Sequence, residues 1–543
     1  MINLLKRFDI FFVVLWGTLL FIPFLGVVHL FDWDEINFAE SAREMIVTGN
    51  YQKVQINYQP FMEKPPLFFW IQVLSMKVFG VGEFAARFPN AIIGIITLVF
   101  IFTIGKKLYG RQLAFLWVLF ITGSFTPHLY FKSGIIDPLY NLFIFAAVYM
   151  LYLYSLSKQT IQAVWLGLFT GLAIITKGPV AVLVVMLCFI TLWALKKFNR
   201  FFSYKDIFIT ALVAFLVSAV WFGFETMERG TVFLSEFLKY QLDLFLNPVA
   251  GHGQPFWYHP LVLLVGCFPA SVIALKFIFK THETANKEQT DFFRIMQIMF
   301  WAVLILFSIV ETKIVHYSSL CYLPLTFMAA MFIHQRFEAG VKFSNFQTAL
   351  LLFTGIFISF IFIALPLTDY LKPYFIPYIK DDFAVAALME SGNWNGYEWI
   401  PGVLLFITVI ITSLFIFKNK VKEGIFILLV FISLFIPLVL KMIVPKIESY
   451  SQGVAISFFE SKQQTDCYIE TLGYKSYAQY FYARTLPAVN TKAYQINWLL
   501  TDSIDKDAYF VLHVNNIKDH INSSMIEIGR KGGFVFYKRK ALR

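Results

Sequence analysis

The chain has 543 residues, of which 58% are hydrophobic, 19% aromatic and only 15% charged, and its mean hydropathy is +0.67. Soluble domains carry about 25% charged residues, so this composition excludes a soluble globular protein, and the aromatic content excludes a disordered one. The formal net charge of +11 is first interpreted as a signal of membrane orientation, because it need not mean nucleic-acid binding in so apolar a chain.

Long apolar segments run through the first 441 residues. About 20 apolar residues are needed to cross the hydrocarbon core as a helix, and the backbone polar groups in lipid must be satisfied inside the segment. The sequence predicts about thirteen such helices, the first of them retained as an anchor. They are expected near residues 10–30, 84–105, 112–127, 135–156, 162–176, 178–195, 207–225, 257–275, 295–311, 317–334, 347–368, 398–416 and 424–441.

The charges between these segments alternate in sign. One set of connecting segments totals 68 residues and holds 19 Lys and Arg against 6 Asp and Glu, whereas the other totals 130 residues and holds 11 against 15. Because basic residues accumulate on the cytoplasmic side, we expect the first set, with the N-terminus, to be cytoplasmic. The longer loops and the C-terminus are then expected on the outer, periplasmic side of the cytoplasmic membrane.

The composition changes after the last predicted span. Residues 442–543 contain 22 charged residues in 102 positions, against 57 in the preceding 441. Short β-type runs near residues 467–470, 508–512 and 533–537 alternate with polar helical stretches such as 475–483, which is typical of an α/β domain. The sequence therefore predicts a transmembrane catalytic domain over 1–441 and a small periplasmic α/β domain over 442–543 with an accessory role.

The first outward loop, residues 31–83, is long for a connection and rich in aromatic residues, which indicates a function. Asp34 can begin a helix that ends at Gly49, with apolar residues at helical spacing. A second helix is expected from Pro65 to Phe79, since proline suits the first helical turn. Both are predicted to be amphipathic helices in the membrane interface.

Motifs in this loop resemble a known family. Residues 34–45 read DEINFAESAREM, residues 63–66 read EKPP and residues 79–89 read FGVGEFAARFP. In this order they resemble the membrane glycosyltransferases of GT-C fold that include lipid A 4-amino-4-deoxy-L-arabinose transferases and protein O-mannosyltransferases. Further matches follow along the chain up to about residue 335, at Asp137-Pro138, residues 176–179 (TKGP), residues 247–258 (NPVAGHGQPFWY), and Lys313 with Tyr317.

The resemblance implies an enzyme that transfers a sugar from a polyprenyl-phosphate carrier, such as undecaprenyl phosphate, with inversion at the anomeric carbon. The acceptor would be lipid A or another envelope lipid, glycan or protein at the outer face of the cytoplasmic membrane. The expected partners are the polyprenyl-phosphate-linked donor, the acceptor and membrane lipids. Neither a nucleotide cofactor nor nucleic acid is expected.

Two carboxylates are the catalytic candidates. Asp34 matches the first motif and can deprotonate an acceptor hydroxyl, orient an acceptor phosphate or bind a metal, and its structural alternative is a helix cap. Asp137 opens the fourth span, where a carboxylate beside hydrocarbon is costly. Its alternative is capping of that helix, with Pro138 in the first turn.

Cationic and phenolic side chains at the outward boundary are candidates for binding the carrier phosphate. Lys64, Lys177 and Lys313 can neutralise its charge, whereas snorkelling to lipid headgroups is the alternative. Lys177 is hardest to explain by snorkelling, because it lies in a short turn between two spans. Tyr317 can donate to the phosphate or belong to the interfacial aromatic belt.

Three further residues of the motifs are assigned supporting roles. Glu35 is expected to be structural or to support Asp34. Arg43 and Arg87 either assist the site or form ion pairs with the acidic residues of the loop.

Glu63 and His252 form a possible metal pair, because a carboxylate and an imidazole suit Zn²⁺, Mn²⁺ or Mg²⁺. His259 and His316 compete for the same role. The four cysteines show neither a disulfide framework nor metal-ligand spacing.

Two other function classes remain open from the sequence. A transporter or flippase of lipid-linked sugars would share the helices and the basic phosphate sites, but transporters show internal repeats and polar residues at the midplane, and neither is evident here. A scaffold whose C-terminal domain binds partners would leave the acidic outward loop unexplained.

Overall fold

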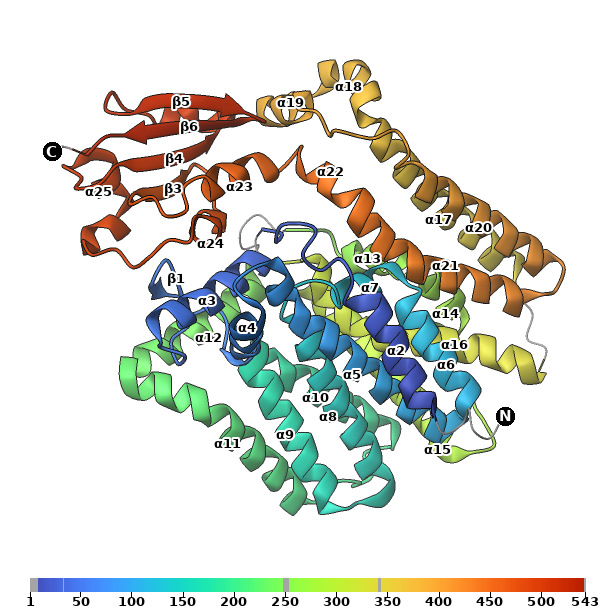
Figure 1. Ribbon diagram of the computed structural model, residues 1–543. Helices are drawn as coiled ribbons and strands as arrows, with labels where there is room; N and C mark the ends of the chain where they lie inside the picture. Colours follow the sequence, from blue (N-terminus) through green and yellow to red (C-terminus); the bar gives the residue numbers. More distant parts are fainter. Residues whose placement is uncertain (1–7, 33, 248–252, 340–342, 542–543) are drawn as a thin grey trace.

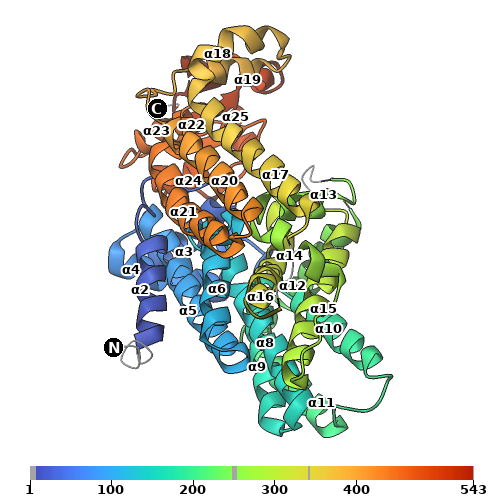
Figure 2. The ribbon, with the colours of Figure 1, turned by 90° about the vertical axis from the view of Figure 1, so that its right-hand side faces the viewer.

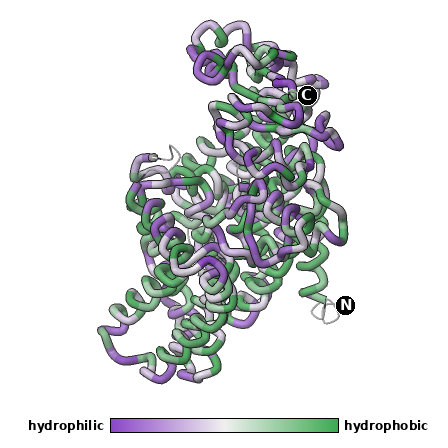
Figure 3. The backbone as a smooth tube through the Cα atoms, turned by 90° about the vertical axis from the view of Figure 1, so that its left-hand side faces the viewer, coloured by the Kyte–Doolittle hydropathy of each residue, from purple (hydrophilic) through white to green (hydrophobic). Residues whose placement is uncertain are grey.

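The computed structural model describes residues 8–32, 34–247, 253–339 and 343–541, with the side chains of 336–339 excepted. A bundle of helices forms the larger part of the molecule, and a small α/β domain from the end of the chain lies at one end of the bundle (Figure 1). The first described residues lie at the opposite end (Figures 1 and 2). Hydrophobic residues dominate the lower part of the bundle, and hydrophilic ones are more frequent in the C-terminal domain (Figure 3).

Nine helices among the described residues are long and apolar enough to cross a membrane. The chain is therefore a polytopic α-helical membrane protein. These spans comprise α5 (Glu83–Tyr109), α8 (Asp137–Ser157), α9 (Thr160–Lys177), α11 (Tyr204–Arg229), α15 (Lys287–Ile309), η3 (Val315–Cys321) with α16 (Tyr322–Ala339), α17 (Asn345–Ala364), α20 (Ile400–Phe417) and α21 (Val421–Met442).

Four of the predicted spans contain shorter helices, namely α2 (Asp9–Phe21), α6 (Arg111–Thr122), α10 (Val180–Leu195) and α14 (Ala270–Phe279). At a rise of about 1.5 Å per residue, none of them alone covers a hydrocarbon core about 30 Å thick. Short helices continue two of them, since α7 (Phe125–Tyr130) follows α6 and α13 (Tyr258–Gly266) precedes α14. The number of thirteen spans stays a prediction.

Small residues let α9 approach α11 closely. A Cβ atom added at Gly167 would lie 2.5 Å from the Thr210 carbonyl oxygen, and one at Gly171 would lie 2.7 Å from Val217 Cβ. Close approach at glycine is a common way for helices to pack in membranes. It holds α9 in the bundle and so places Lys177 at the end of this helix.

The first loop contains α3 (Asp34–Thr48), a short hairpin of β1 (Gln55–Ile56) and β2 (Gln59–Pro60), and α4 (Leu67–Phe79). The two predicted helices are confirmed. Every residue from Glu35 to Met45 is buried within the protein, so α3 is covered by protein on all sides, and its place in the membrane interface stays a prediction. Its charged residues are tolerated there because they have partners, as Arg43 and Glu40 do at 2.6 Å. By contrast, α4 leaves Leu74 and Val78 more than 60% exposed.

The C-terminal domain contains a four-stranded sheet in the order β3-β4-β6-β5. β3 and β4 are parallel, and the other two pairs are antiparallel. Phe510, Leu512 and Val535 lie in its core. The strands are β3 (Tyr468–Leu472), β4 (Ala508–His513), β5 (Ile526–Lys531) and β6 (Phe534–Arg539). The helices of this part are α22 (Val444–Glu448), α23 (Gly453–Glu460), α24 (Ala478–Ala483), η6 (Thr491–Tyr494), α25 (Ile496–Thr501), η7 (Val514–Asn516) and α26 (Ile517–His520).

Two more helices, α18 (Thr368–Phe375) and α19 (Asp382–Met389), follow α17 and lie beside the sheet (Figure 1). The Tyr482 hydroxyl accepts a hydrogen bond from the Leu30 amide at 2.7 Å. Arg43 donates to the Thr485 carbonyl at 2.8 Å, and His29 lies 2.9 Å from Glu448. These contacts hold the C-terminal domain against the loop that carries Asp34.

Candidate active site

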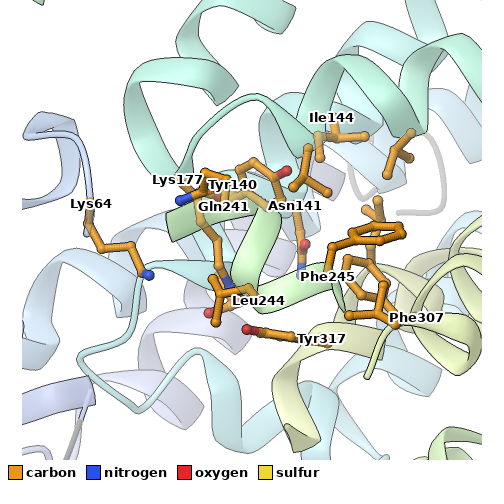
Figure 4. Close-up of a pocket in the computed structure, with 15 residues that line it drawn as sticks. Lys64, Tyr140, Asn141, Ile144, Lys177, Gln241, Leu244, Phe245, Phe307 and Tyr317 are labelled. Carbon is orange, nitrogen blue, oxygen red and sulfur yellow. Dashed lines mark hydrogen bonds and ion pairs between the residues drawn. The ribbon is translucent and has the colours of Figure 1, made fainter. Parts of the chain in front are cut away.

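A pocket that encloses about 720 Å³, part of it open to solvent, lies where the ends of several helices meet the first loop. Four residues proposed from the sequence line it together, namely Lys64, Asp137, Lys177 and Tyr317. In Figure 4 the two lysines lie toward one end of the pocket, and the rings of Phe245 and Phe307 lie toward the other. The remaining lining residues are Tyr140, Asn141, Ile144, Val180, Val184, Gln241, Leu244, Val310 and Leu320. The pocket thus joins a charged end to an apolar wall.

Lys177 and Asp137 form an ion pair at the charged end. Lys177 Nζ lies 2.6 Å from Asp137 Oδ1, and the two side chains are 17% and 4% exposed. Lys177 is the last residue of α9 and is followed by Gly178, whose φ of +123° favours glycine. Asp137 opens α8, with Pro138 in the first turn. In this pair Asp137 holds the ammonium of Lys177 in the pocket, and part of the Lys177 side chain remains accessible.

Two rings face the same ammonium. Lys177 Nζ lies 5.3 Å from the centre of the Tyr317 ring and 5.9 Å from that of Tyr140. A cation over an aromatic face is held there by the ring quadrupole. Tyr317 comes from η3, more than a hundred positions from either other residue. The three helices therefore supply one cationic centre bordered by phenols.

The residues of the EKPP motif lie beside α12 (Thr231–Leu246). The Tyr240 hydroxyl donates to Glu63 Oε2 at 2.8 Å, and Lys64 Nζ lies 5.4 Å from the centre of the Tyr240 ring. Burial lowers the pKa of Lys64, although the charge of Glu63 acts in the opposite direction. Lys64 is only partly exposed, and its ammonium faces the pocket, where it can bind an anionic ligand.

Asp34 begins α3 and pairs with a residue from η3. His316 Nε2 lies 3.3 Å from Asp34 Oδ2, and the two side chains are 14% and 34% exposed. Within the described ranges, the Asp34 carboxylate has no hydrogen bond to a backbone amide of its own helix. The Asp34 side chain is therefore partly exposed and has the imidazole of His316 beside it.

Gln241 of α12 contributes an amide to the pocket. Its Nε2 atom is buried and has no hydrogen-bond partner among the described residues. A buried donor without a partner is costly, so it is available to a ligand oxygen. Tyr240, Gln241 and Phe245 are not predicted as site residues from the sequence, because they lie between the predicted spans 207–225 and 257–275, in a stretch expected to be an outward loop. The apolar spacing of that stretch is the signal that would have indicated a helix there.

Glu35, Arg43 and Arg87 lie outside the pocket lining. Arg87 contacts both carboxylate oxygens of Glu35 at 2.7 and 2.9 Å and donates to three carbonyls of residues 25–29. Glu35 also accepts from the Gly134 amide. This buried pair fixes the start of α3 against α5, and so positions Asp34. Arg43 pairs with Glu40 and also contacts the C-terminal domain. Arg43 and Arg87 thus form ion pairs with acidic residues of the loop, which was the alternative to a role in the site.

The remaining candidates are less directly placed. Lys313 is buried, at 5% exposure, but it does not line the pocket. His252 lies outside the described residues, and His259 is buried in α13. In the part of the chain that the structure describes, no three His, Cys, Asp or Glu side chains gather as metal ligands. Of the two proposed metal ligands, the structure describes only Glu63.

Comparison with known proteins relates the chain to membrane glycosyltransferases. A family model described as dolichyl-phosphate-mannose-protein mannosyltransferase matches residues 63–221. An undecaprenyl phosphate-alpha-4-amino-4-deoxy-L-arabinose arabinosyl transferase of Proteus mirabilis is 26% identical over 413 residues, which are 71% of this chain and 73% of the relative. The corresponding enzyme of Edwardsiella ictaluri is 25% identical over 56% of each chain.

Solved structures share the fold. ArnT from Cupriavidus metallidurans, in a crystal structure with undecaprenyl phosphate, matches with a TM-score of 0.74 at 14% identity, over 97% of each chain. The oligosaccharyltransferase of Archaeoglobus fulgidus matches with a TM-score of 0.51 at 11% identity, over 94% of this chain and 69% of its own. The similarity to ArnT thus extends over both the helical bundle and the C-terminal domain.

Proposed function

We propose that this chain, a GT-C membrane glycosyltransferase that resembles the aminoarabinose and protein mannosyl transferases, moves a sugar from polyprenyl phosphate to an envelope acceptor. The observation that carries the proposal is the pocket in which Lys64, Lys177 and Tyr317 meet beside an apolar wall. Such a pocket suits a ligand with an anionic head and a hydrocarbon tail. Undecaprenyl phosphate is the carrier that the relatives' names and the bound ArnT structure support.

The carrier phosphate would lie between Lys64 and Lys177, with the Tyr317 hydroxyl donating to it. Charge develops on this phosphate as the bond to the sugar breaks, and fixed cations stabilise that charge without reorganising. The first isoprene units would contact Phe245 and Phe307. Asp137 acts through Lys177 by holding its ammonium in place.

The acceptor would bind on the other side of the sugar, near Asp34. Its oxygen attacks the anomeric carbon, the bond from that carbon to the phosphate oxygen breaks, and polyprenyl phosphate leaves, so the configuration is inverted. If the acceptor group is a hydroxyl, its proton passes to the Asp34 carboxylate, which His316 orients. If it is a phosphate, as on lipid A, no proton has to be removed and Asp34 orients the acceptor.

The membrane arrangement proposed from the charge distribution suits this reaction. α12 and the first loop, which contribute Gln241 and Lys64 to the pocket, lie at the end of the bundle next to the C-terminal domain (Figure 1). With the N-terminus in the cytoplasm, the pocket and that domain would face the periplasm at the inner membrane. Acceptors on the outer face are then lipid A or another envelope lipid, glycan or protein.

A transfer assay tests the function. The purified protein in liposomes is given labelled polyprenyl-phosphate sugars and a panel of acceptors that includes lipid A. We expect free polyprenyl phosphate and glycosylated acceptor to form in equal amounts. If the labelled lipid instead crosses the bilayer with its sugar intact and no product forms, the chain is a transporter and the proposal fails.

We propose in addition that Glu63 and His252 hold a divalent metal. Bound Zn²⁺ or Mn²⁺ would supply positive charge next to the carrier phosphate. Metal analysis of the purified protein is expected to find a divalent ion that is lost in the Glu63→Ala/His252→Ala double variant and retained in a His520→Ala control. An equal metal content in all three proteins would contradict this assignment.

A further inference from the structure

A second cleft lies in the C-terminal domain, between the edge strand β3, α24 and the segment that follows α24. It encloses about 1130 Å³, part of it open to solvent. One residue of the first outward loop, Asn57, also lines it. The other lining residues used below are Lys462, Asp466, Tyr468, Glu470, Tyr480, Arg484, Tyr494 and Lys506.

The polar groups of this cleft form an ordered network. The Tyr480 hydroxyl donates to Glu470 at 2.8 Å, and Asn57 Nδ2 lies 3.2 Å from the same hydroxyl. Asn57 Nδ2 also lies 3.5 Å from Glu470 Oε1. Glu470 also accepts from the Gln479 side chain and the Thr471 amide, so the network holds its carboxylate in place and orients the Tyr480 hydroxyl at the wall of the cleft. Tyr468 and Tyr494 add two more phenol rings, which combine an apolar face with a polar edge.

The charges of the cleft disfavour a strongly anionic ligand. Lys506 is paired with Asp466 at 2.5 Å, and Lys462 Nζ lies 4.3 Å from the centre of the Tyr509 ring. Arg484 donates to the Val81 carbonyl at 3.0 Å. Lys462 and Lys506 thus have partners within the protein, whereas the Nη1 atom of Arg484 is buried without a hydrogen-bond partner among the described residues and can donate to a ligand oxygen. With Asp466 and Glu470, the net formal charge of these five residues is +1. Hydroxyl, amide and carboxylate groups beside aromatic rings instead suit an uncharged, polyhydroxylated ligand.

The cleft is close to the candidate active site. Asn57 precedes Glu63 by six positions, which an extended chain spans in about 20 Å at most. The charge of Glu63 also acts on Tyr477 of the C-terminal domain. The ring of Tyr477 lies 6.4 Å from that of Tyr480, which lines the cleft. Through Asn57, the cleft is thus joined to the loop that carries Glu63 and Lys64.

From these observations we propose that the cleft is a saccharide-binding site that holds a distal part of the acceptor's sugar chain while its reacting group lies near Asp34. The choice of ligand rests on the proposed transfer function. Because Asn57 comes from the first loop, the complete site forms only when the C-terminal domain packs against that loop. The domain would then act in acceptor selection.

Direct titration tests this site without donor. The probe is a set of uncharged hexose oligosaccharides, added to the full-length protein in detergent and followed by calorimetry. Tyr480→Phe keeps the ring but removes the hydroxyl that bonds Glu470. We expect the Kd of this variant for the oligosaccharide to rise about tenfold, because a hydrogen bond that positions the ligand-binding groups is lost. Tyr374→Phe, at a side chain that is 69% exposed on α18, is the matched control and should bind like the parent.

The results of these measurements distinguish failure of the saccharide site from failure of the proposed transfer function. Thermal melting of both variants establishes that they are folded, and Asn57→Ala provides a second variant with the same expected loss. Equal oligosaccharide affinity in the parent and both cleft variants would overturn the proposal. Binding of an extended acceptor peptide in place of the oligosaccharide would overturn it too. If the oligosaccharide binds as expected but no sugar is ever transferred, the transfer function fails and the saccharide site stands.

Discussion

Replacing Lys177 with alanine is expected to lower the rate of sugar transfer by about 10²- to 10³-fold, as the loss of one preorganised electrostatic contact does in other active sites. Lys177 is the cation that two phenol rings and Asp137 hold in the pocket. Without it, negative charge on the departing phosphate is poorly compensated. Release of polyprenyl phosphate under saturating acceptor measures the effect.

The same change also affects stability, and this effect has to be distinguished from the loss of catalysis. Asp137 would be left buried without its partner, which would lower the free energy of unfolding by about 3–5 kcal/mol. The Lys177→Ala/Asp137→Asn double variant removes both charges. If Lys177 serves only to neutralise Asp137, the double variant should recover activity. We expect it to remain inactive although its melting temperature recovers. Lys446→Ala, at a lysine outside the pocket that donates to the Asn393 carbonyl, should behave like the parent.

Asp34→Asn is expected to reduce kcat by about 10²- to 10⁴-fold with a hydroxyl acceptor, the range seen when a general base is removed. Asparagine is as favourable as aspartate at a helix start, and loss of a charge in the first turn costs only about 0.3–1 kcal/mol. The folded structure should therefore persist. Steady-state kinetics should show little change in the KM for the donor, because Lys64 and Lys177 are retained.

This substitution distinguishes the two interpretations of Asp34. A purely structural role predicts that Asp34→Asn is active and only Asp34→Ala is impaired, whereas a role as base predicts that both are impaired. Asp382→Asn makes the same change in the first turn of α19, at an exposed position, and serves as the control. Full activity of Asp34→Asn would remove Asp34 from the catalytic role.

The charged residues that carry the site could be identified from the sequence to a considerable extent. Lys64, Asp137, Lys177 and Tyr317 all line the same pocket. They could be identified because charges are rare in so apolar a chain, and those at the outward ends of spans are conspicuous. For the same reason, composition alone indicated the membrane-spanning helices.

Other residues of the same motifs could not be ranked in this way. Arg43 and Arg87 are as charged as Lys64, yet each forms a buried ion pair that organises α3. Lys313 resembles Lys177 in type and predicted location, but it does not line the pocket. The type of a charged residue and its distance from a predicted span do not determine which side chain it will contact in the folded protein.

The sequence by itself determined that the chain is a polytopic membrane protein, that Asp34 and Gly49 bound a helix, and that a few boundary charges are the candidates for chemistry. These properties follow from local composition and from the dihedral preferences of single residues. Only the tertiary structure decided that His316 meets Asp34, that α12 supplies Tyr240 and Gln241, and that α3 is buried beneath the C-terminal domain. The partners are far apart in the chain, and their contact depends on how the helices pack, for which no local pattern exists.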